Sequence, residues 1–335
     1  MLHVFYSDMA ELPLPDKHAF PKQKYALTRR LVQSLAERRG NPLGVTLRPG
    51  PRVTREELLR VHTPEYIDAV FTGTLTERHQ RAIGFPWSEG FVQRQLHSTG
   101  ATLAAARAAV YAANGPATAH ASGHAGGPVI DQATWGAHLA GGTHHAFADR
   151  GQGFCVFNDV AVAIRTLRAE GRIDGALVID CDVHQGNGTA ALFRDDPRVF
   201  TFSIHGAKNF PLKKEASDLD VPLPDGCGDE EYLRLLGPAL DRVFAARHAV
   251  GGGRAAIFYL AGADPFVSDK YGRMKLTKPG LRERDRRVLT RCRAAGLPTT
   301  VVLGGGYARD VNDIAEIYAA TIEEAAAAAC GSPSG

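Results

Sequence analysis

The chain has 335 residues, of which 44% are hydrophobic, and its 39 Lys and Arg against 36 Asp and Glu give a net charge of +3. This composition supports a large core, and the lack of any long basic run argues against nucleic acid as a partner. No stretch reaches the roughly 18 apolar residues of a membrane span, and the N-terminus lacks an apolar segment of signal-peptide length. The five cysteines are widely spaced without a CxxC pair, which is typical of reduced thiols. We therefore expect a soluble, cytoplasmic protein.

The N-terminal third predicts two short strands among helices. Strand patterns cover 3–7 and 44–47, and a leucine recurs every four residues between them, as on one face of a helix. Thr54 followed by Glu57 is a capping-box signal, and Pro64 suits the first position of a helix. The predicted helices are 25–38, 55–61, 64–71 and 91–113.

The remainder of the chain alternates strands with helices. The predicted strands are 117–121, 137–140, 176–180, 199–204, 255–261 and 299–303, and the predicted helices are 159–169, 189–193, 230–247, 278–295 and 310–329. This alternation predicts a three-layer α/β/α fold with a mostly parallel central sheet. The glycine-rich stretch 123–127 lacks the Lys-Ser/Thr of a P-loop, so a plain loop is favoured over a phosphate cradle. Without a repeat or linker, we expect one domain over 1–335, with 331–335 as a frayed tail.

The stretch LVIDCDVHQGNG, residues 177–188, carries the strongest chemical pattern. Its apolar start is typical of a buried strand, and Asp180, Asp182 and His184 follow at alternate positions. Alternate side chains of a strand point to one side, and ligands bind at the carboxyl ends of strands in open α/β sheets. Asp-x-His supplies oxygen and nitrogen ligands suited to Zn²⁺ or a similar ion. The alternative is a polar turn in which His184 caps a neighbouring group.

Reactive residues follow three other predicted strands. Asp264 comes after an apolar run, as a third metal ligand would, and the adjacent His144 and His145 could act as an acid/base pair. Tyr307 follows three glycines, which let backbone approach a ligand closely. Each has a simpler interpretation, as a turn cap, a polar turn and a surface tyrosine, respectively. Their shared position at one sheet edge favours a common site.

Six segments in this order resemble the histone deacetylase family, which includes acetoin-utilisation and acetylpolyamine deacetylases. They are GGTHHAF, GFCVFND, VIDCDVHQGNG, FSIHG, AGADP and LGGGY. The resemblance runs from about Phe20 to Ile322 and implies the arginase/deacetylase fold. The HQGNG form and the segment KLTKPGLRERDRRVL are most similar to class IV deacetylases and their bacterial relatives.

The resemblance implies a set of metal sites. The Zn²⁺ ligands would be Asp182, His184 and Asp264, with Fe²⁺ as an alternative in the cell. Asp180 would lie outside the zinc shell, orient His144 and help to bind a structural K⁺ near Ser203. A second K⁺ site would use backbone oxygens around Phe193, Asp196 and Val199.

The resemblance also implies catalytic roles. His145 would be the general base and then the general acid, with His144 as its electrostatic partner, while Tyr307 would polarise the amide carbonyl. Class I enzymes have Asp where this chain has Asn187, so a carboxylate that would stabilise protonated His145 is missing. Lys24 would take the place of a family Arg near the acetate exit.

The channel residues bear on the substrate. By resemblance, Gly153, Phe154 and Phe210 would line a narrow channel for the stem of an acyl-lysine or acyl-amine. Polyamine-selective relatives carry a Glu near the position of Tyr271, and its absence here favours acyl-lysine.

We therefore expect a zinc-dependent amidohydrolase that uses metal-activated water to remove acetyl or longer acyl groups from acyl-lysine or a related acylated amine. The alternatives are an acetylpolyamine deacetylase, an arginase-like ureohydrolase with two Mn²⁺, and a non-catalytic module that binds acyl-lysine. We expect no direct nucleic-acid or membrane partner. The acyl chain length, the physiological metal and the oligomeric state stay open.

Overall fold

The computed structural model describes residues 1–38, 41, 44–114, 135–251 and 254–331, and is built around an eight-stranded sheet. Every pairing between these strands is parallel. The strand order is β2-β1-β3-β8-β7-β4-β5-β6, so the carboxyl ends of all eight strands meet at one edge. The strands are β1 (Leu2–Tyr6), β2 (Val45–Pro49), β3 (Trp135–His138), β4 (Gly175–Asp180), β5 (Val199–Gly206), β6 (Leu219–Leu223), β7 (Ala255–Leu260) and β8 (Thr299–Val302).

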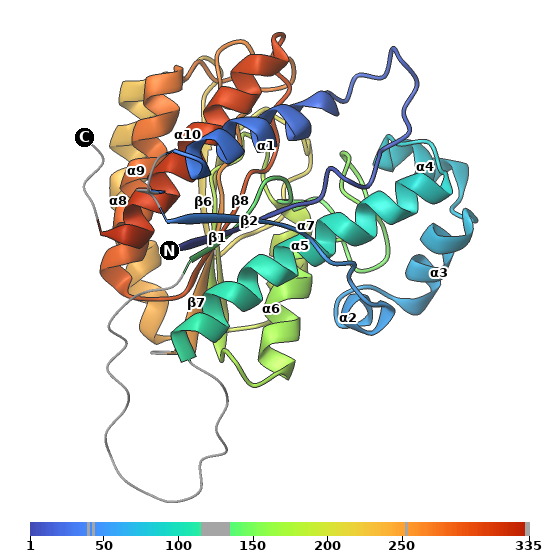
Figure 1. Ribbon diagram of the computed structural model, residues 1–335, viewed down its shortest axis with the longest axis horizontal. Helices are drawn as coiled ribbons and strands as arrows, with labels where there is room; N and C mark the ends of the chain where they lie inside the picture. The colour runs from blue at the N-terminus through green and yellow to red at the C-terminus, as the bar shows by residue number, and fades with distance from the viewer. Residues whose placement is uncertain (39–40, 42–43, 115–134, 252–253, 332–335) are drawn as a thin grey trace, which may run out of the picture.

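Helices cover both faces of this sheet (Figure 1). Within β4, Leu177 and Ile179 pack with apolar residues of α1 and α8 to α10, whereas Ala176 and Val178 pack with residues of α2 to α7. This alternation is the two-residue period of a strand that is buried on both faces. The helices are α1 (Gln23–Ala36), α2 (Arg55–Leu59), α3 (Pro64–Thr72), α4 (Glu77–Ile83), α5 (Glu89–Asn114), α6 (Asp159–Ala169), α7 (Asn187–Phe193), α8 (Asp229–Ala245), α9 (Lys278–Ala295) and α10 (Val311–Cys330). The predicted three-layer α/β/α architecture is confirmed.

Local sequence signals set several helix ends. The capping box of α2 forms as predicted, since the Thr54 hydroxyl accepts from Glu57 N–H and the Glu57 carboxylate accepts from Thr54 N–H. Pro64 occupies the first turn of α3. At the starts of α6 and α9, the side chains of Asn158 and Thr277 each accept a backbone N–H of the first turn. These short-range contacts explain why the predicted bounds of α6 and α9 agree with the structure.

Three predictions of local structure were incomplete. The strand expected at 137–140 lies two residues earlier, as β3. The short α4 was missed because its sequence ERHQRAI is mainly polar. The strand β6 was missed because Pro222 interrupts its pattern, and it is tolerated since β6 lies at the sheet edge. The expected strand 117–121, loop 123–127 and tail residues 332–335 lie outside the described residues, while Gly331 ends α10 in a left-handed conformation.

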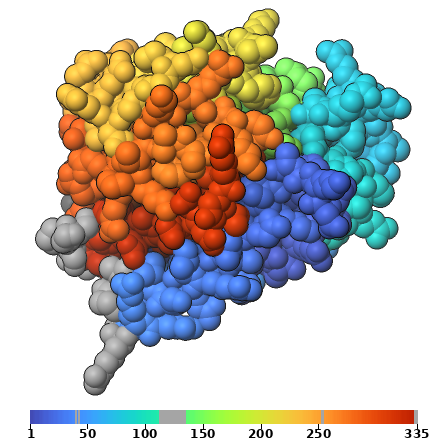
Figure 2. Space-filling view, turned by 90° about the horizontal axis from the view of Figure 1, so that it is seen from above, coloured from blue at the N-terminus to red at the C-terminus, as the bar shows by residue number. Residues whose placement is uncertain are grey.

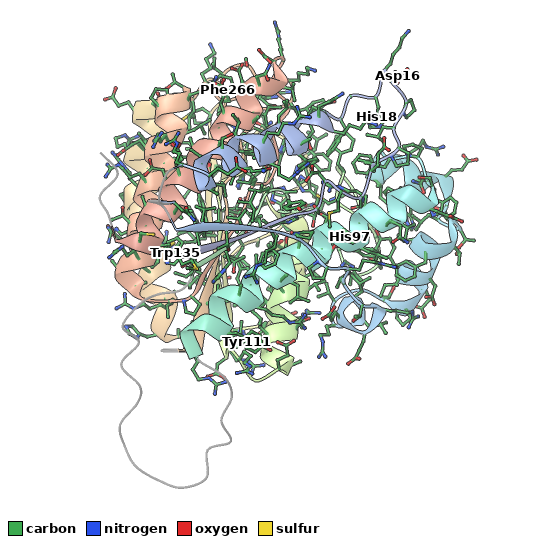
Figure 3. All side chains as sticks on the ribbon, in the orientation of Figure 1. Asp16, His18, His97, Tyr111, Trp135 and Phe266 are labelled. Carbon is green, nitrogen blue, oxygen red and sulfur yellow. The ribbon has the colours of Figure 1, made fainter. Side chains whose placement is uncertain are left out.

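The helix nearest the N-terminus, α1, and the last helix, α10, pack side by side. Figure 2 shows the N-terminal segment in blue adjoining the C-terminal segment in red. In Figure 3, Phe266 in the loop after β7 lies at the opposite end of the view from Tyr111 near the end of α5. The end of α5 therefore lies away from the loop that follows β7. None of the helices in the described ranges is long and apolar enough to cross a membrane.

Candidate metal and active site

Three predicted ligands converge at the carboxyl ends of β4 and β7. His184 Nδ1 lies 3.0 Å from Asp182 Oδ1 and 3.1 Å from Asp264 Oδ2. One ligand atom from each residue falls within 4.8 Å of the others, and all three side chains are buried. Two carboxylates and one imidazole around a common point form a set of three protein ligands, which leaves further positions for water and substrate. This buried cluster could hold a metal ion.

A glycine leaves room for an ion beside this cluster. Gly305 donates its N–H to Asp182 Oδ2 at 2.7 Å. A Cβ placed on Gly305 would lie 2.1 Å from Asp264 Oδ2 and 2.8 Å from Asp182 Oδ2, where it would fill the space between the two carboxylates. The absence of a side chain there keeps their oxygens accessible. The donor set and this opening fit a divalent cation.

The two predicted histidines lie against the cluster, each held by its Nδ1. His144 Nδ1 contacts Asp180 Oδ2 at 2.7 Å, and His145 Nδ1 contacts Asn187 Oδ1 at 2.8 Å. Their ring centroids are 4.1 Å apart. In each ring the Nδ1 contact leaves Nε2 as the nitrogen available to a reacting group. The pairing of one histidine with a carboxylate and the other with an amide makes their electrostatics different.

The pKa values of the two histidines diverge for this reason. Burial lowers the pKa of His144, but the Asp180 and Asp182 carboxylates more than offset it and raise this pKa to about 9. Burial also lowers the pKa of His145, and the charges of His144 and His184 act in the same direction, so this pKa lies well below its ordinary value. His145 is therefore the neutral member of the pair, which is the form a base requires.

Tyr307 enters the site from the loop after β8. Burial raises the pKa of its hydroxyl well above the ordinary value, so the group stays protonated. Its backbone N–H donates to Asp269 Oδ2 at 2.6 Å, and Asp269 Oδ1 also accepts the N–H groups of Tyr271 and Gly272, each at 2.8 Å. Within the described parts of the chain, the Tyr307 hydroxyl has no hydrogen-bond partner, although the residue is only 8% exposed. Because Tyr307 also lines a cavity, its unpartnered hydroxyl is available to a ligand.

These residues line a cavity of about 460 Å³. Its walls include the predicted channel residues Gly153, Phe154, Phe210 and Tyr271, together with His144, His145, Asp182, His184, Tyr307 and Lys24. Gly153 has a φ of +56°, and a Cβ on it would approach the His145 ring to 2.9 Å, so only glycine fits there without displacing the ring. The channel therefore leads directly to the histidine pair.

Other predicted residues lie behind or beside the cavity. Asp180 and Ser203 are register partners on neighbouring strands, and the Ser203 hydroxyl contacts His205 Nδ1 at 2.9 Å. The backbone oxygens of Phe193 and Asp196 already accept N–H groups from Asp196 and Val199, although a carbonyl oxygen has a second lone pair. Both potassium sites stay predictions. Lys24 Nζ donates to Gly306 O at 3.0 Å, beside the Tyr307 loop.

Two supporting residues were not identified from the sequence. Asp159 accepts the N–H groups of Gly142 and Thr143 and so fixes the turn before the histidine pair. The buried Arg284 donates to Gly262 O at 2.7 Å and to Cys181 O at 3.4 Å, in the two backbone segments that carry the ligand carboxylates. Asp159 lies in the quoted segment GFCVFND and Arg284 in KLTKPGLRERDRRVL, so both signals were present without an assigned role.

Comparison with known proteins gives a consistent result. A sequence model of the histone deacetylase domain matches residues 18–325. An uncharacterised protein of Picosynechococcus sp. is 40% identical over 302 residues, which cover 90% of this chain and 91% of that protein. Histone deacetylase 2 of Arabidopsis thaliana is 32% identical over 56% of this chain, and an acetoin utilization protein of Staphylococcus aureus is 29% identical over 62%. The last two matches span about half of each relative's length, 48% and 49%.

Solved structures share the fold. The crystal structure of a histone deacetylase homologue from Aquifex aeolicus superposes with a TM-score of 0.76 at 21% identity, covering 100% of this chain and 85% of that chain. A histone deacetylase homologue complexed with SAHA gives a TM-score of 0.74 at 22% identity, covering 99% and 84%. At this level of identity the likeness concerns the fold.

Proposed function

Since the chain belongs to the histone deacetylase family, we propose that it is a zinc-dependent amidohydrolase that removes acetyl or longer acyl groups from acyl-lysine or a related acylated amine. The family supports a deacetylase activity; the zinc ion, the substrate and the residue roles below are our proposal. We further propose that residues 1–335 form one deacetylase domain.

One observation carries this proposal: Asp182 and His184 of the ligand cluster, the histidine pair and Tyr307 all line one cavity. A divalent ion held by Asp182, His184 and Asp264 would supply a Lewis acid toward a carbonyl and lower the pKa of a water molecule. Zn²⁺ suits this mixed nitrogen and oxygen set, with Fe²⁺ as an alternative. The aromatic walls formed by Phe154 and Phe210 would hold the aliphatic stem of an acyl-lysine and exclude bulk water.

The chain's own residues would then move the protons. His145 is kept neutral by burial and by the charges of His144 and His184, and its Nδ1 contact with Asn187 leaves Nε2 free. It would take a proton from the attacking water and later deliver it to the leaving amine. His144, charged beside Asp180, would stabilise negative charge that develops near it. The Tyr307 hydroxyl, protonated and without a partner in the described residues, would donate to the same developing oxyanion.

The alternative with two Mn²⁺ requires carboxylates that bridge two ions. In the part of the chain that the structure describes, the only group of three potential ligands is Asp182, His184 and Asp264. The nearby Asp180 and Asp269 use their oxygens on His144 Nδ1 and on backbone N–H groups. This arrangement favours a single ion.

Hydrolysis of an acetyl-lysine peptide tests the proposal. The purified protein should release acetate, lose turnover with a chelator and regain it when Zn²⁺ is restored. SAHA, which a solved homologue binds, should inhibit in competition with the peptide. A protein that binds the peptide without hydrolysing it, with Zn²⁺ present, would instead be the non-catalytic module.

A further inference from the structure

Two cations from different loops stand at the mouth of the cavity. Lys208 lies in the loop after β5 and Arg273 in the loop after β7, and both line the cavity. Their side chains are 74% and 55% exposed, which places them at its outer end. Among the described residues that line the cavity, the only carboxylate is the buried Asp182 at the inner end. No acidic side chain of the wall therefore opposes these cations at the entrance.

A single carboxylate behind the cavity wall lies close to both cations. Asp225 Oδ2 lies 3.2 Å from Arg273 Nη1 and 4.0 Å from Lys208 Nζ. A single negative charge shared between two positive charges leaves the mouth with a net positive charge. Lys214 lies close by, and its Nζ donates to the backbone oxygens of Asn209 and Pro211. The Asp220 carboxylate offsets its charge, so the positive charge of the mouth is attributed to Lys208 and Arg273 alone.

Hydrogen bonds hold the two loops together, so the backbone positions of the two cations are fixed relative to each other. The buried Asn209 donates its Nδ2 to Tyr271 O at 2.7 Å and accepts Arg273 N–H at its Oδ1 at 3.3 Å. Gly226 N–H donates to Arg273 O at 2.7 Å. The segment that carries Asp225 and the two loops that carry the cations are thereby joined by hydrogen bonds to backbone groups. A preorganised charge costs less to use in binding than one on a mobile loop.

We propose that Lys208 and Arg273 make this entrance selective for acyl-lysine flanked by acidic residues, and that they disfavour polycationic substrates such as acetylpolyamines. This inference rests on the proposed function, because it concerns what enters the same cavity. A net positive entrance attracts anionic groups and repels cationic ones. Each exposed charge pair contributes at most about fivefold in binding, so the two cations together should produce a preference of about tenfold rather than an absolute selection.

The test compares three acetyl-lysine peptides that are identical except for two flanking residues, which are Glu, Gln or Lys. At low salt, kcat/KM for the Glu peptide should exceed that for the Lys peptide about tenfold, chiefly through KM. The difference should approach unity at about 1 M salt, where screening acts over about 3 Å. N-acetylspermidine should be a poorer substrate than the Gln peptide.

Variants assign the preference to these residues. The double variant Lys208→Gln, Arg273→Gln should reduce the Glu-to-Lys ratio to less than about twofold, in line with the loss of both charge pairs. Lys275→Gln is the matched control, since Lys275 is an exposed cation in the same loop that does not line the cavity, and it should keep the parental ratio. Equal kcat/KM for the Glu and Lys peptides, a ratio that survives the double variant, or a preference for acetylspermidine would each overturn the inference. Failure of the parent to hydrolyse even the Gln peptide would instead contradict the proposed function.

Discussion

Replacing Asn187 with Asp tests whether His145 is the base. Asn187 Oδ1 lies 2.8 Å from His145 Nδ1, and both side chains are buried. A carboxylate at this position would stabilise the imidazolium, and an opposite charge at such close range typically moves a pKa by about 1–3 units, or about 1.4–4 kcal/mol. Because burial and the charges of His144 and His184 hold the pKa of His145 well below its ordinary value, the substitution should raise it. Asn187 is the first residue of α7, where a negative charge is also compatible with the helix.

The sign of the effect on activity follows from the role of a base. Activity falls when the pH drops through the pKa of the base, so a raised pKa should move the acidic limb of the kcat/KM profile to higher pH by about 1–3 units. Asn187→Ala is the matched control: it removes the contact without adding charge, and it should lower kcat/KM without moving this limb upward. An acidic limb that stays in place or moves downward in Asn187→Asp would refute His145 as the base or its contact with residue 187.

Three further substitutions have expected outcomes. Tyr307→Phe removes a hydroxyl that lacks a partner in the described residues, so thermal stability should be kept while kcat falls about 10²–10³-fold; activity within about threefold of the parent would exclude it as the oxyanion donor. Arg284→Met leaves the buried Asp285 without its ion pair, and denaturant unfolding should show a loss of about 3–5 kcal/mol, partly restored by adding Asp285→Asn; an unchanged midpoint would contradict the buried pair. Thr54→Ala removes the α2 cap and should lower the free energy of unfolding by about 0.5–2 kcal/mol in the same assay, with kcat/KM unchanged. A loss of activity would show that this cap affects the active site as well as stability.

The sequence was sufficient to predict which residues come together at the candidate site, because each of them lies at the end of a buried strand or in the loop that follows one. Asp180 is the last residue of β4, Asp182 and His184 follow it in the next loop, and Asp264 lies in the loop after β7, the neighbouring strand. In a parallel sheet the carboxyl ends of all strands lie at one edge, so these residues come close together regardless of loop conformation. The helices with clear caps, such as the one beginning after Thr54, were predictable for a similar short-range reason.

The entrance and the supporting contacts were not predictable in this way. The proximity of Lys208, Asp225 and Arg273 depends on how three loops pack, and their spacing along the chain carries no periodic signal. The role of Arg284 depends on burial under two strand ends, whereas its sequence neighbours suggest only a charged helix. The strand β6 was not predicted because Pro222 is compatible with a strand only at the edge of a sheet. The position of β6 at the edge is known only from the folded sheet.

Titration of the metal-free protein with Zn²⁺ tests the central claim most directly. Ion binding and hydrolysis of an acetyl-lysine peptide would be followed together in the parent and in His184→Ala. We expect activity to rise in proportion to bound Zn²⁺ and to level off at one ion per chain, because one group of three ligands is present in the described residues. His184→Ala should lose both the tight binding and the turnover. Full turnover without metal, saturation at two ions, or a His184→Ala protein that behaves like the parent would contradict a single catalytic ion held by Asp182, His184 and Asp264.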